Sequence, residues 1–314
     1  MSTDILAITS PIYAAIAIGY LVVKLGWFGQ SDMRTLGKYV MDIALPALLF
    51  NAMASRDFAE VFHPGYMLVF ALGGLATILI SYLWFTAIRT EPPRRAVAVM
   101  GTTCPNSGFI GYPVMLLTFP DLAGVILALN MLVENILLIP ICLILMDLAR
   151  GGGQVSISKR VTGILWGVIK RPMVIGLLLG LAISVARVPI PDPVTQLFQM
   201  LAASASALSL VVIGGSLAGL SLRGNHWKAA QVALGKLILH PGLVALAALA
   251  VTAMGLSLSP ELTAAVILSA AMPMFGIYSV LAQEIGHEGM ASIAMLIATA
   301  LGFVTLSVFL GVLT

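Results

Sequence analysis

The stretch "TTCPNSGFIGYP", residues Thr102 to Pro113, interrupts a segment that otherwise has the composition of an apolar helix. It contains two prolines, two glycines, an asparagine and a serine. Proline removes a helical hydrogen bond and glycine permits unwound backbone, so this stretch predicts a helix that is broken in its middle. The rest of the chain decides whether the break is a simple kink or a binding site.

The composition of the chain indicates that it is built for a lipid bilayer. Of its 314 residues, 60% are hydrophobic and 9% are charged, whereas soluble domains carry about 25% charged residues. Only helices and closed barrels satisfy their backbone groups in hydrocarbon, and these long apolar runs lack the alternation of barrel strands. We therefore predict an all-α polytopic membrane protein.

Ten apolar runs approach the length of about 20 helical residues that a membrane crossing requires. The predicted spans are 5–24, 36–55, 64–88, 96–118, 122–147, 165–186, 194–222, 228–254, 261–284 and 289–313. The longest polar break follows the fifth span. We therefore predict a first five-helix repeat at 1–150, a cytoplasmic linker at 151–164 and a second five-helix repeat at 165–314.

The basic residues predict the orientation of these spans. Thirteen of the 16 Lys and Arg residues lie in or beside the loops that join spans 1–2, 3–4, 5–6 and 7–8. By the positive-inside rule these loops face the cytoplasm, so we expect both termini on the outer, periplasmic side of an inner membrane. The net charge of +3 is explained by these loops, and we expect no nucleic acid partner. Five spans per half also give the halves opposite orientations, as in an inverted repeat.

The two halves align without gaps around the break. Residues 95–111 match residues 263–279, which brings Pro105 onto Pro273 at an offset of 168 positions. A single proline in a membrane helix is usually a kink without a ligand. Paired breaks in inverted halves are instead typical of a transporter's midplane site, because half-helix N-termini present N–H groups and positive dipole ends to an anion. We therefore predict that spans 4 and 9 are crossed, broken helices.

Three motifs resemble one known family. They are "PNSGFIGYPVM" (Pro105 to Met115), "GKLILHP" (Gly235 to Pro241) and "SAAMPMFGIYSVLAQEIG" (Ser269 to Gly286). All three resemble the auxin efflux carrier family, and more closely its bacterial members, which are often labelled malonate or dicarboxylate transporters. The plant PIN-type carriers have a longer central loop. They also have Asn-Pro-Asn at the crossover, where this chain has Cys104-Pro105-Asn106.

The resemblance implies an elevator-type carrier in which spans 4 and 9 cross at their unwound centres. Spans 1, 2, 6 and 7 would form a scaffold, and spans 3–5 and 8–10 would move against it. An organic anion would bind between these two parts. The residues that we expect at the substrate site are Pro105, Asn106, Ser107, Gly108, Pro273, Met274, Gly276, Tyr278 and Asn51.

Ionisable residues inside the predicted spans are a second indication of function, because charges in hydrocarbon are costly. Glu134 is near the middle of span 5 and could carry the proton of a proton-coupled carrier, or pair structurally with an amide. Lys236 and His240 share one face of span 8. Lys236 could face a substrate carboxylate or extend toward the headgroups. Asp42 could pair with Lys236 or with Lys38 beside it.

A secondary carrier explains these features better than the other function classes. A channel needs a polar pore lining, an intramembrane enzyme needs a nucleophile with its base, and a pump needs an ATP-binding loop. None of these stands out in the sequence, and we expect no enzymatic activity, cofactor or metal. The expected partners are a small carboxylate, the lipid bilayer and a proton. Formation of a homodimer stays open. Facilitated transport, sodium coupling and an indole acid as substrate stay open as alternatives.

Overall fold

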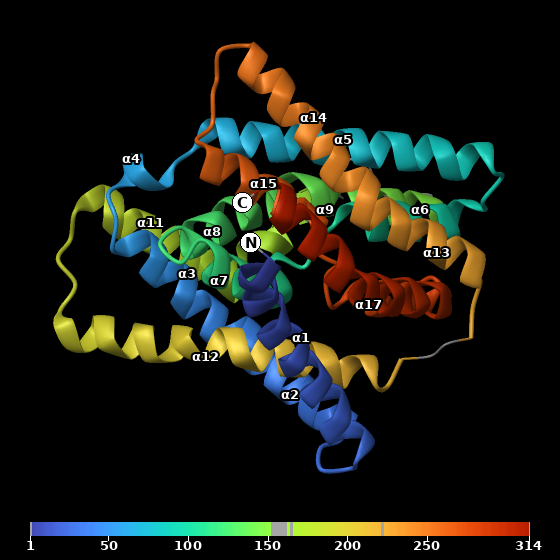
Figure 1. The fold of residues 1–314 in the computed structure, drawn as a ribbon, viewed down its shortest axis with the longest axis horizontal. Helices are drawn as coiled ribbons and strands as arrows, with labels where there is room; N and C mark the ends of the chain where they lie inside the picture. The colour runs from blue at the N-terminus through green and yellow to red at the C-terminus, as the bar shows by residue number, and fades with distance from the viewer. Residues whose placement is uncertain (1, 152–161, 164–165, 221–222, 314) are drawn as a thin grey trace.

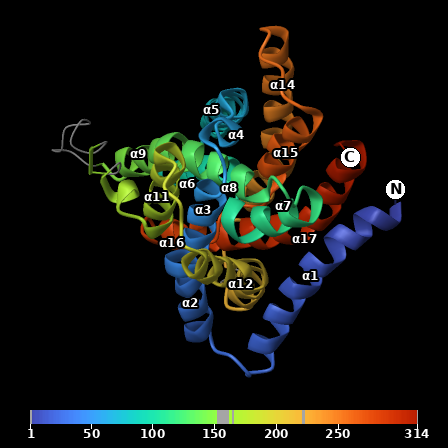
Figure 2. The same cartoon turned by 90° about the vertical axis from the view of Figure 1, so that its left-hand side faces the viewer.

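The computed structural model describes residues 2–151, 162–163, 166–220 and 223–313, and every regular element in these ranges is a helix (Figure 1). The prediction of an all-helical protein is therefore confirmed for this part of the chain. The predicted linker at 151–164 lies almost wholly outside the described residues. The N- and C-terminal ends lie close together in both views (Figures 1 and 2), and the first and last helices of the chain contact each other.

The helices follow one another with short connections, and four of them contain a π-helical turn, labelled η. In the first half they are α1 (Ser2–Lys24), α2 (Gln30–Tyr39), η1 (Val40–Ala44), α3 (Leu45–Ala54), α4 (Phe58–Val61), α5 (Pro64–Ala87), α6 (Pro92–Thr103), η2 (Ser107–Gly111), α7 (Tyr112–Thr118), α8 (Ala123–Val133), η3 (Glu134–Leu138) and α9 (Ile139–Ala149). In the second half they are α11 (Pro172–Ala186), α12 (Asp192–Leu217), α13 (His226–Leu234), η4 (Gly235–Leu239), α14 (His240–Ala253), α15 (Pro260–Ala271), α16 (Tyr278–Gln283) and α17 (Glu288–Leu313).

Seven helices or continuous helix series in the described residues are long and apolar enough to cross a membrane. They correspond to seven of the ten predicted spans, and they identify a multi-pass membrane protein. The segments predicted at 96–118, 165–186 and 261–284 contain shorter apolar helices instead, namely Ser107–Thr118, Pro172–Ala186 and Pro260–Ala271. The first and third of these segments are the two in which a broken helix was predicted, and the arrangement of ten spans stays a prediction.

The four π-helical turns have a common local cause. Each ends two residues before a proline, and the prolines are Pro46, Pro113, Pro140 and Pro241. A proline ring cannot donate to the carbonyl four residues earlier and clashes with it. The wider π turn carries the chain past this clash while the residue before each proline donates five residues back, as Tyr112 N does to Ser107 O.

The helices pack into two bodies. The first body consists of α1, α2, α3, α11 and α12; in Figure 1, α1, α2 and α12 lie in the lower part of the view, and α11 lies at the left. The second body consists of α5, α6, α9 and α13 to α17. Between the two, α8 contacts α3 of the first body and α5 and α15 of the second, whereas η2 and α7 contact α12 of the first body and α8.

Small residues bring the helices of the first body close together. Gly214 of α12 lies directly against the backbone of α1 at Ile16, so that a Cβ there would collide with the Ile16 carbonyl. Gly176 of α11 lies in the same way against Pro46 of α3. Such close approaches are typical of membrane helix pairs, where van der Waals packing drives association. The first body is therefore a tightly packed unit.

Candidate functional site

Two unwound segments meet in the middle of the molecule. Residues 104–106 follow α6, and residues 272–277 follow α15. Cys104 and Met272, which precede the two prolines, both have extended backbone, as the steric clash with a following proline ring requires. Pro105 and Met274 form an antiparallel bridge, in which Asn106 N donates to Pro273 O at 2.8 Å and Phe275 N donates to Cys104 O at 3.4 Å. The freed backbone groups of each break thus bond to the other break.

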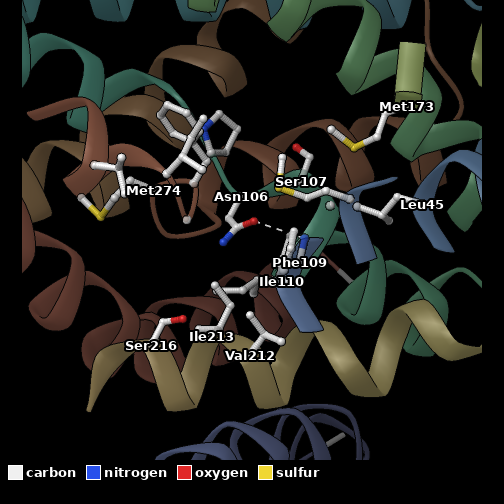
Figure 3. Close-up of a pocket in the computed structure, with 18 of the residues that line it drawn as sticks. Leu45, Asn106, Ser107, Phe109, Ile110, Met173, Val212, Ile213, Ser216 and Met274 are labelled. Carbon is white, nitrogen blue, oxygen red and sulfur yellow. Dashed lines mark hydrogen bonds between the residues drawn. The ribbon is translucent and has the colours of Figure 1, made fainter. Parts of the chain in front are cut away.

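Asn106 begins the helix that follows the first break. Its side-chain Oδ1 accepts a hydrogen bond from Phe109 N at 3.1 Å, which is an N-cap, and its carbonyl accepts from Gly111 N at 2.8 Å (Figure 3). Because Oδ1 is held by this cap, the orientation of Nδ2 is fixed. Asn106 is 3% exposed, yet its Nδ2 has no hydrogen-bond partner within the part of the chain that the structure describes. A buried amide donor without a partner costs about 1–3 kcal/mol, and a bound acceptor would offset that cost.

A cavity of about 470 Å³ opens at this crossing, between the two bodies. Its walls come from α2 and η1, from η2, from η3, from α12 and from the segment after Met272. In Figure 3, Asn106 lies between Met274 on one side and Phe109 and Ser107 on the other, with Val212, Ile213 and Ser216 of α12 below. The lining is mostly apolar but includes charged side chains of both signs: Arg34, Lys38, Arg171, Asp42 and Glu134.

The π turn η3 points two adjacent polar side chains into this cavity. Glu134 is 2% exposed and accepts a hydrogen bond from Ser107 Oγ at 2.5 Å. Asn135 is 3% exposed; its Nδ2 donates to Met131 O at 2.9 Å and its Oδ1 accepts from Arg171 Nη1 at 2.8 Å. Glu134 is thereby bonded to the first break, and Asn135 to the residue that precedes α11.

Arg171 is the one half-buried cation of the cavity wall, since Arg34 and Lys38 are exposed. It caps α11 immediately before Pro172, on the first body, whereas its partner Asn135 belongs to η3. An arginine side chain is not deprotonated in proteins, so the Arg171 guanidinium stays charged at neutral pH. The cavity therefore contains a fixed positive charge.

One hydrogen bond joins the helix after the first break directly to the first body. Ser209 Oγ of α12 donates to Phe109 O at 2.9 Å. Phe109 is four residues before Pro113, so its carbonyl has lost the partner that an ordinary helix would provide. Helix α12 of the first body thus satisfies a backbone group that the proline has freed.

Several residues expected at the substrate site line the cavity, and others do not. Pro105, Asn106, Ser107, Gly108, Met274 and Gly276 line it, as do Asp42 and Glu134. Pro273 is not part of the lining and contributes its carbonyl to Asn106 N. Tyr278 is buried away from it, where its hydroxyl donates to Val97 O at 3.1 Å. Asn51 lies farther along α3 and is also outside the lining.

Lys236 and His240 form a separate buried cluster. Lys236 is fully buried, with its Nζ 2.6 Å from His240 Nδ1 and 2.7 Å from Ala270 O. Neither residue lines the cavity, and among the described residues Asp42 is not within ion-pair distance of Lys236. The contact with Ala270, one residue before the end of α15, instead ties η4 to the helix that leads into the second break.

Sequence reasoning missed part of the cavity wall. Arg171 and Arg34 were counted only as loop cations, Lys38 was considered only as a loop cation and a partner for Asp42, and Ser216 and Thr299 were not singled out at all. Arg171 had one local signal, because it directly precedes the proline that opens an apolar helix. The others are brought to the site by tertiary packing alone.

A smaller cavity of about 350 Å³ adjoins the first one between η3 and α11. The two cavities share Met131, Asn135 and Met173 as lining residues. Apart from Asn135, its walls are aliphatic or thioether side chains, such as Leu132 and Val174.

A multi-pass helical protein with a partly charged cavity between two bodies has the general form of a membrane transporter. In agreement with this form, residues 5–310 match the family model described as membrane transport protein. The chain therefore belongs to this family, which includes the auxin efflux carriers that its motifs resemble.

Two relatives match nearly the whole chain at low identity, and a third matches about one third of it. A protein of Rhizobium meliloti (strain 1021) named "Putative malonate transporter" is 25% identical over 310 residues, which are 97% of this chain and 94% of that protein. "Uncharacterized transporter YfdV" of Escherichia coli (strain K12) is 24% identical over 303 residues, 94% of this chain and 92% of that protein. An "Uncharacterized transporter" of Methanothermobacter thermautotrophicus is 28% identical over 100 residues, 32% of this chain and 33% of that protein.

Proposed function

We propose that the protein is a secondary transporter of small organic anions, with malonate-like dicarboxylates as the best candidates. The observation that carries this proposal is the donor of Asn106, which is buried, unpaired and fixed by its cap at the edge of the cavity. It stands at the N-terminus of the twelve-residue helix Ser107–Thr118, where free N–H groups and the helix dipole favour an anion. The malonate label of one relative supports the same choice.

We further propose that the chain is a five-plus-five inverted repeat of ten membrane-spanning segments. The bounds of α6 (Pro92–Thr103) and α15 (Pro260–Ala271) support this, because both helices begin at a proline and are offset by the same 168 positions. In this arrangement spans 4 and 9 are the crossed, broken helices. The loop cations then face the cytoplasm, and both termini face the periplasm across the inner membrane.

Alternating access would come from movement of one body against the other. The first body, which contains spans 1, 2, 6 and 7, would be the scaffold, and the second body with η2, α7 and α8 would carry the substrate. Gly214 holds α12 against α1 and Gly176 holds α11 against α3, which supports the first body acting as one unit. The few polar bonds between the two parts, such as Ser209 to Phe109 O, would have to break during each movement. This is an elevator-type mechanism.

For coupling, we propose a proton carried by Glu134. Its carboxylate is buried, bonded to Ser107 beside Asn106, and part of the cavity wall. A proton exchanged at this position would change the charge next to the bound anion. Facilitated transport without coupling is the alternative, and it requires no titration at Glu134. A sodium-coupled symporter or an indole acid carrier is less well supported, although Phe109 and Phe275 line the cavity.

The experiment that tests the function is uptake of labelled malonate by purified protein in proteoliposomes, with empty liposomes as the control. We expect saturable uptake that responds to an imposed pH gradient. Glu134→Gln keeps an acceptor for Ser107 but cannot exchange a proton, so uptake by this variant should no longer respond to the gradient. Uptake that is absent for every carboxylate tested would overturn the function. An unchanged gradient response in Glu134→Gln would overturn only the coupling.

A further inference from the structure

The proposed function uses none of the three cations that line the cavity, Arg34, Lys38 and Arg171, and of these Arg171 has the most buried surroundings. Arg171 is half-buried, lines the cavity and is bonded to Asn135. Its neighbour Lys170 is exposed, lies over the ring of Trp166 at 4.9 Å from the ring centre, and does not line the cavity. Two adjacent cations of the same segment thus have different surroundings.

Asn135 determines how Arg171 is held. The Nδ2 of Asn135 donates to Met131 O in its own helix, which fixes the amide and turns Oδ1 toward Arg171. A guanidinium has five N–H donors in a planar fork, and Asn135 accepts from Nη1. A neutral amide holds the fork without neutralising its charge. A carboxylate at the same position would instead cancel the charge.

Arg171 and Asn106 belong to one connected arrangement around the cavity. Asn106 is followed by Ser107, which donates to Glu134, and Glu134 is followed by Asn135, which accepts from Arg171. The cavity thus has an amide donor at the crossing and a guanidinium on the first body. A ligand that touches both would span the boundary between the two bodies.

We propose that Arg171, positioned by Asn135, binds a second anionic group of the substrate and so selects dianions over monoanions. This inference rests on the proposed function and adds the residue that binds the second anionic group of the substrate. One carboxylate interacts with Asn106 Nδ2 at the start of the helix, and the other with the guanidinium. Arginine is well suited to bind a carboxylate, because its planar guanidinium can donate two parallel hydrogen bonds to the two oxygens. Hydrogen bonds between charged groups are also stronger than those between neutral groups.

The test compares malonate with its monomethyl ester, which has nearly the same shape and one charge fewer. Binding of each is measured by calorimetry on the purified full-length protein. In Arg171→Gln, we expect malonate affinity to fall by at least about tenfold and the affinity for the ester to change by less than about threefold. Lys170→Gln is the matched control, because it removes the same charge from the adjacent, exposed position. It should leave both affinities within about twofold.

A second variant removes the charge without removing the arginine. Asn135→Asp is nearly isosteric and gives Arg171 a carboxylate partner, so it should reproduce the selective loss of malonate binding. Equal losses for malonate and the ester would overturn the inference, because they would mean that Arg171 only maintains the structure or joins the two bodies. Unchanged malonate affinity in Arg171→Gln would also overturn it. If the wild-type protein binds no carboxylate, the proposed function fails and this inference fails with it.

Discussion

The two breaks at the crossing have the same backbone role but different side chains. After Pro105 the chain reads Asn106, Ser107 and Gly108; after Pro273 it reads Met274, Phe275 and Gly276. The first break is capped by its own asparagine and continues as a twelve-residue helix. The second has no side-chain cap and is followed by the six-residue helix α16. The two halves of the proposed repeat thus share the crossing, whereas polar side chains follow the first break and apolar side chains the second.

The difference extends to the helix that packs beside each break. Glu134, which bonds to Ser107, corresponds at the offset of 168 positions to Gly302 of α17. A Cβ at Gly302 would come within 2.9 Å of the Tyr13 hydroxyl and 3.2 Å of the Pro273 ring. One half therefore has a carboxylate where the other has close steric packing. The two corresponding positions therefore have different roles: Glu134 forms a hydrogen bond, and Gly302 allows close packing.

The largest expected effect is at Asn106. Asn106→Asp keeps the oxygen that caps the helix but replaces the unpaired donor by a negative charge. A like charge beside a bound anion costs several kcal/mol, so malonate uptake should fall by at least about 100-fold. Met274→Leu at the corresponding position should change uptake by less than about threefold, because it is a volume-conserving apolar exchange. Comparable losses in both variants would mean that the two breaks contribute equally to recognition.

The next effect concerns stability. Gly302→Leu should lower the free energy of unfolding by about 1–3 kcal/mol, because the added side chain has no space between Tyr13 and Pro273. Gly242→Leu in α14 is the control, since a Cβ there would meet nothing within 4 Å. Thermal unfolding in detergent measures both variants. If Gly302→Leu were as stable as the control, close packing would not explain the glycine.

A smaller effect is expected at Ser107. Ser107→Ala removes the hydroxyl that donates to Glu134 and should slow uptake by about tenfold, as expected for loss of a hydrogen bond to a charged group. In a Glu134→Gln background the same change should have much less effect, because the two residues act through one contact. Uptake rates of the four proteins give this double-mutant cycle. Additive effects would show that Ser107 acts independently of Glu134.

The smallest effect is expected at the end of α16. Glu284 bonds to Arg150 at 2.8 Å, but both side chains are largely exposed. Exposed ion pairs contribute less than about 1 kcal/mol, so Glu284→Gln should hardly change the unfolding temperature. Uptake should also be the same in sodium and choline buffers, before and after the substitution. A sodium-dependent uptake that Glu284→Gln removes would favour the sodium-coupled alternative.

The main features of the fold were predictable from the sequence because they follow from local rules. Long apolar runs require helices in a bilayer, and Pro105 and Pro273 interrupt them by removing hydrogen bonds. The matching repeat then indicated which residues to compare. The same rules indicated Asn106, Ser107 and Glu134 as candidate functional residues, and these side chains do line the cavity.

Other features depend on packing that no local pattern reveals. The sequence shows Lys236 only as a charge in an apolar run, whereas its partners His240 and Ala270 are defined by the contact between η4 and α15. Tyr278 is close to the second break along the chain, but its side chain turns toward Val97. Arg171 was assigned to a loop, because charge counting does not distinguish a cation in solvent from one bonded to Asn135.

The bridge between Asn106 N and Pro273 O consists of main-chain atoms only. Mutations that exchange side chains at Met274 or Phe275 leave these atoms in place, so they can alter the shape of the cavity without dismantling its frame. Side chains of the cavity can therefore be exchanged without loss of the main-chain bridge. New cargo preferences can arise by single substitutions while the supporting framework is inherited unchanged.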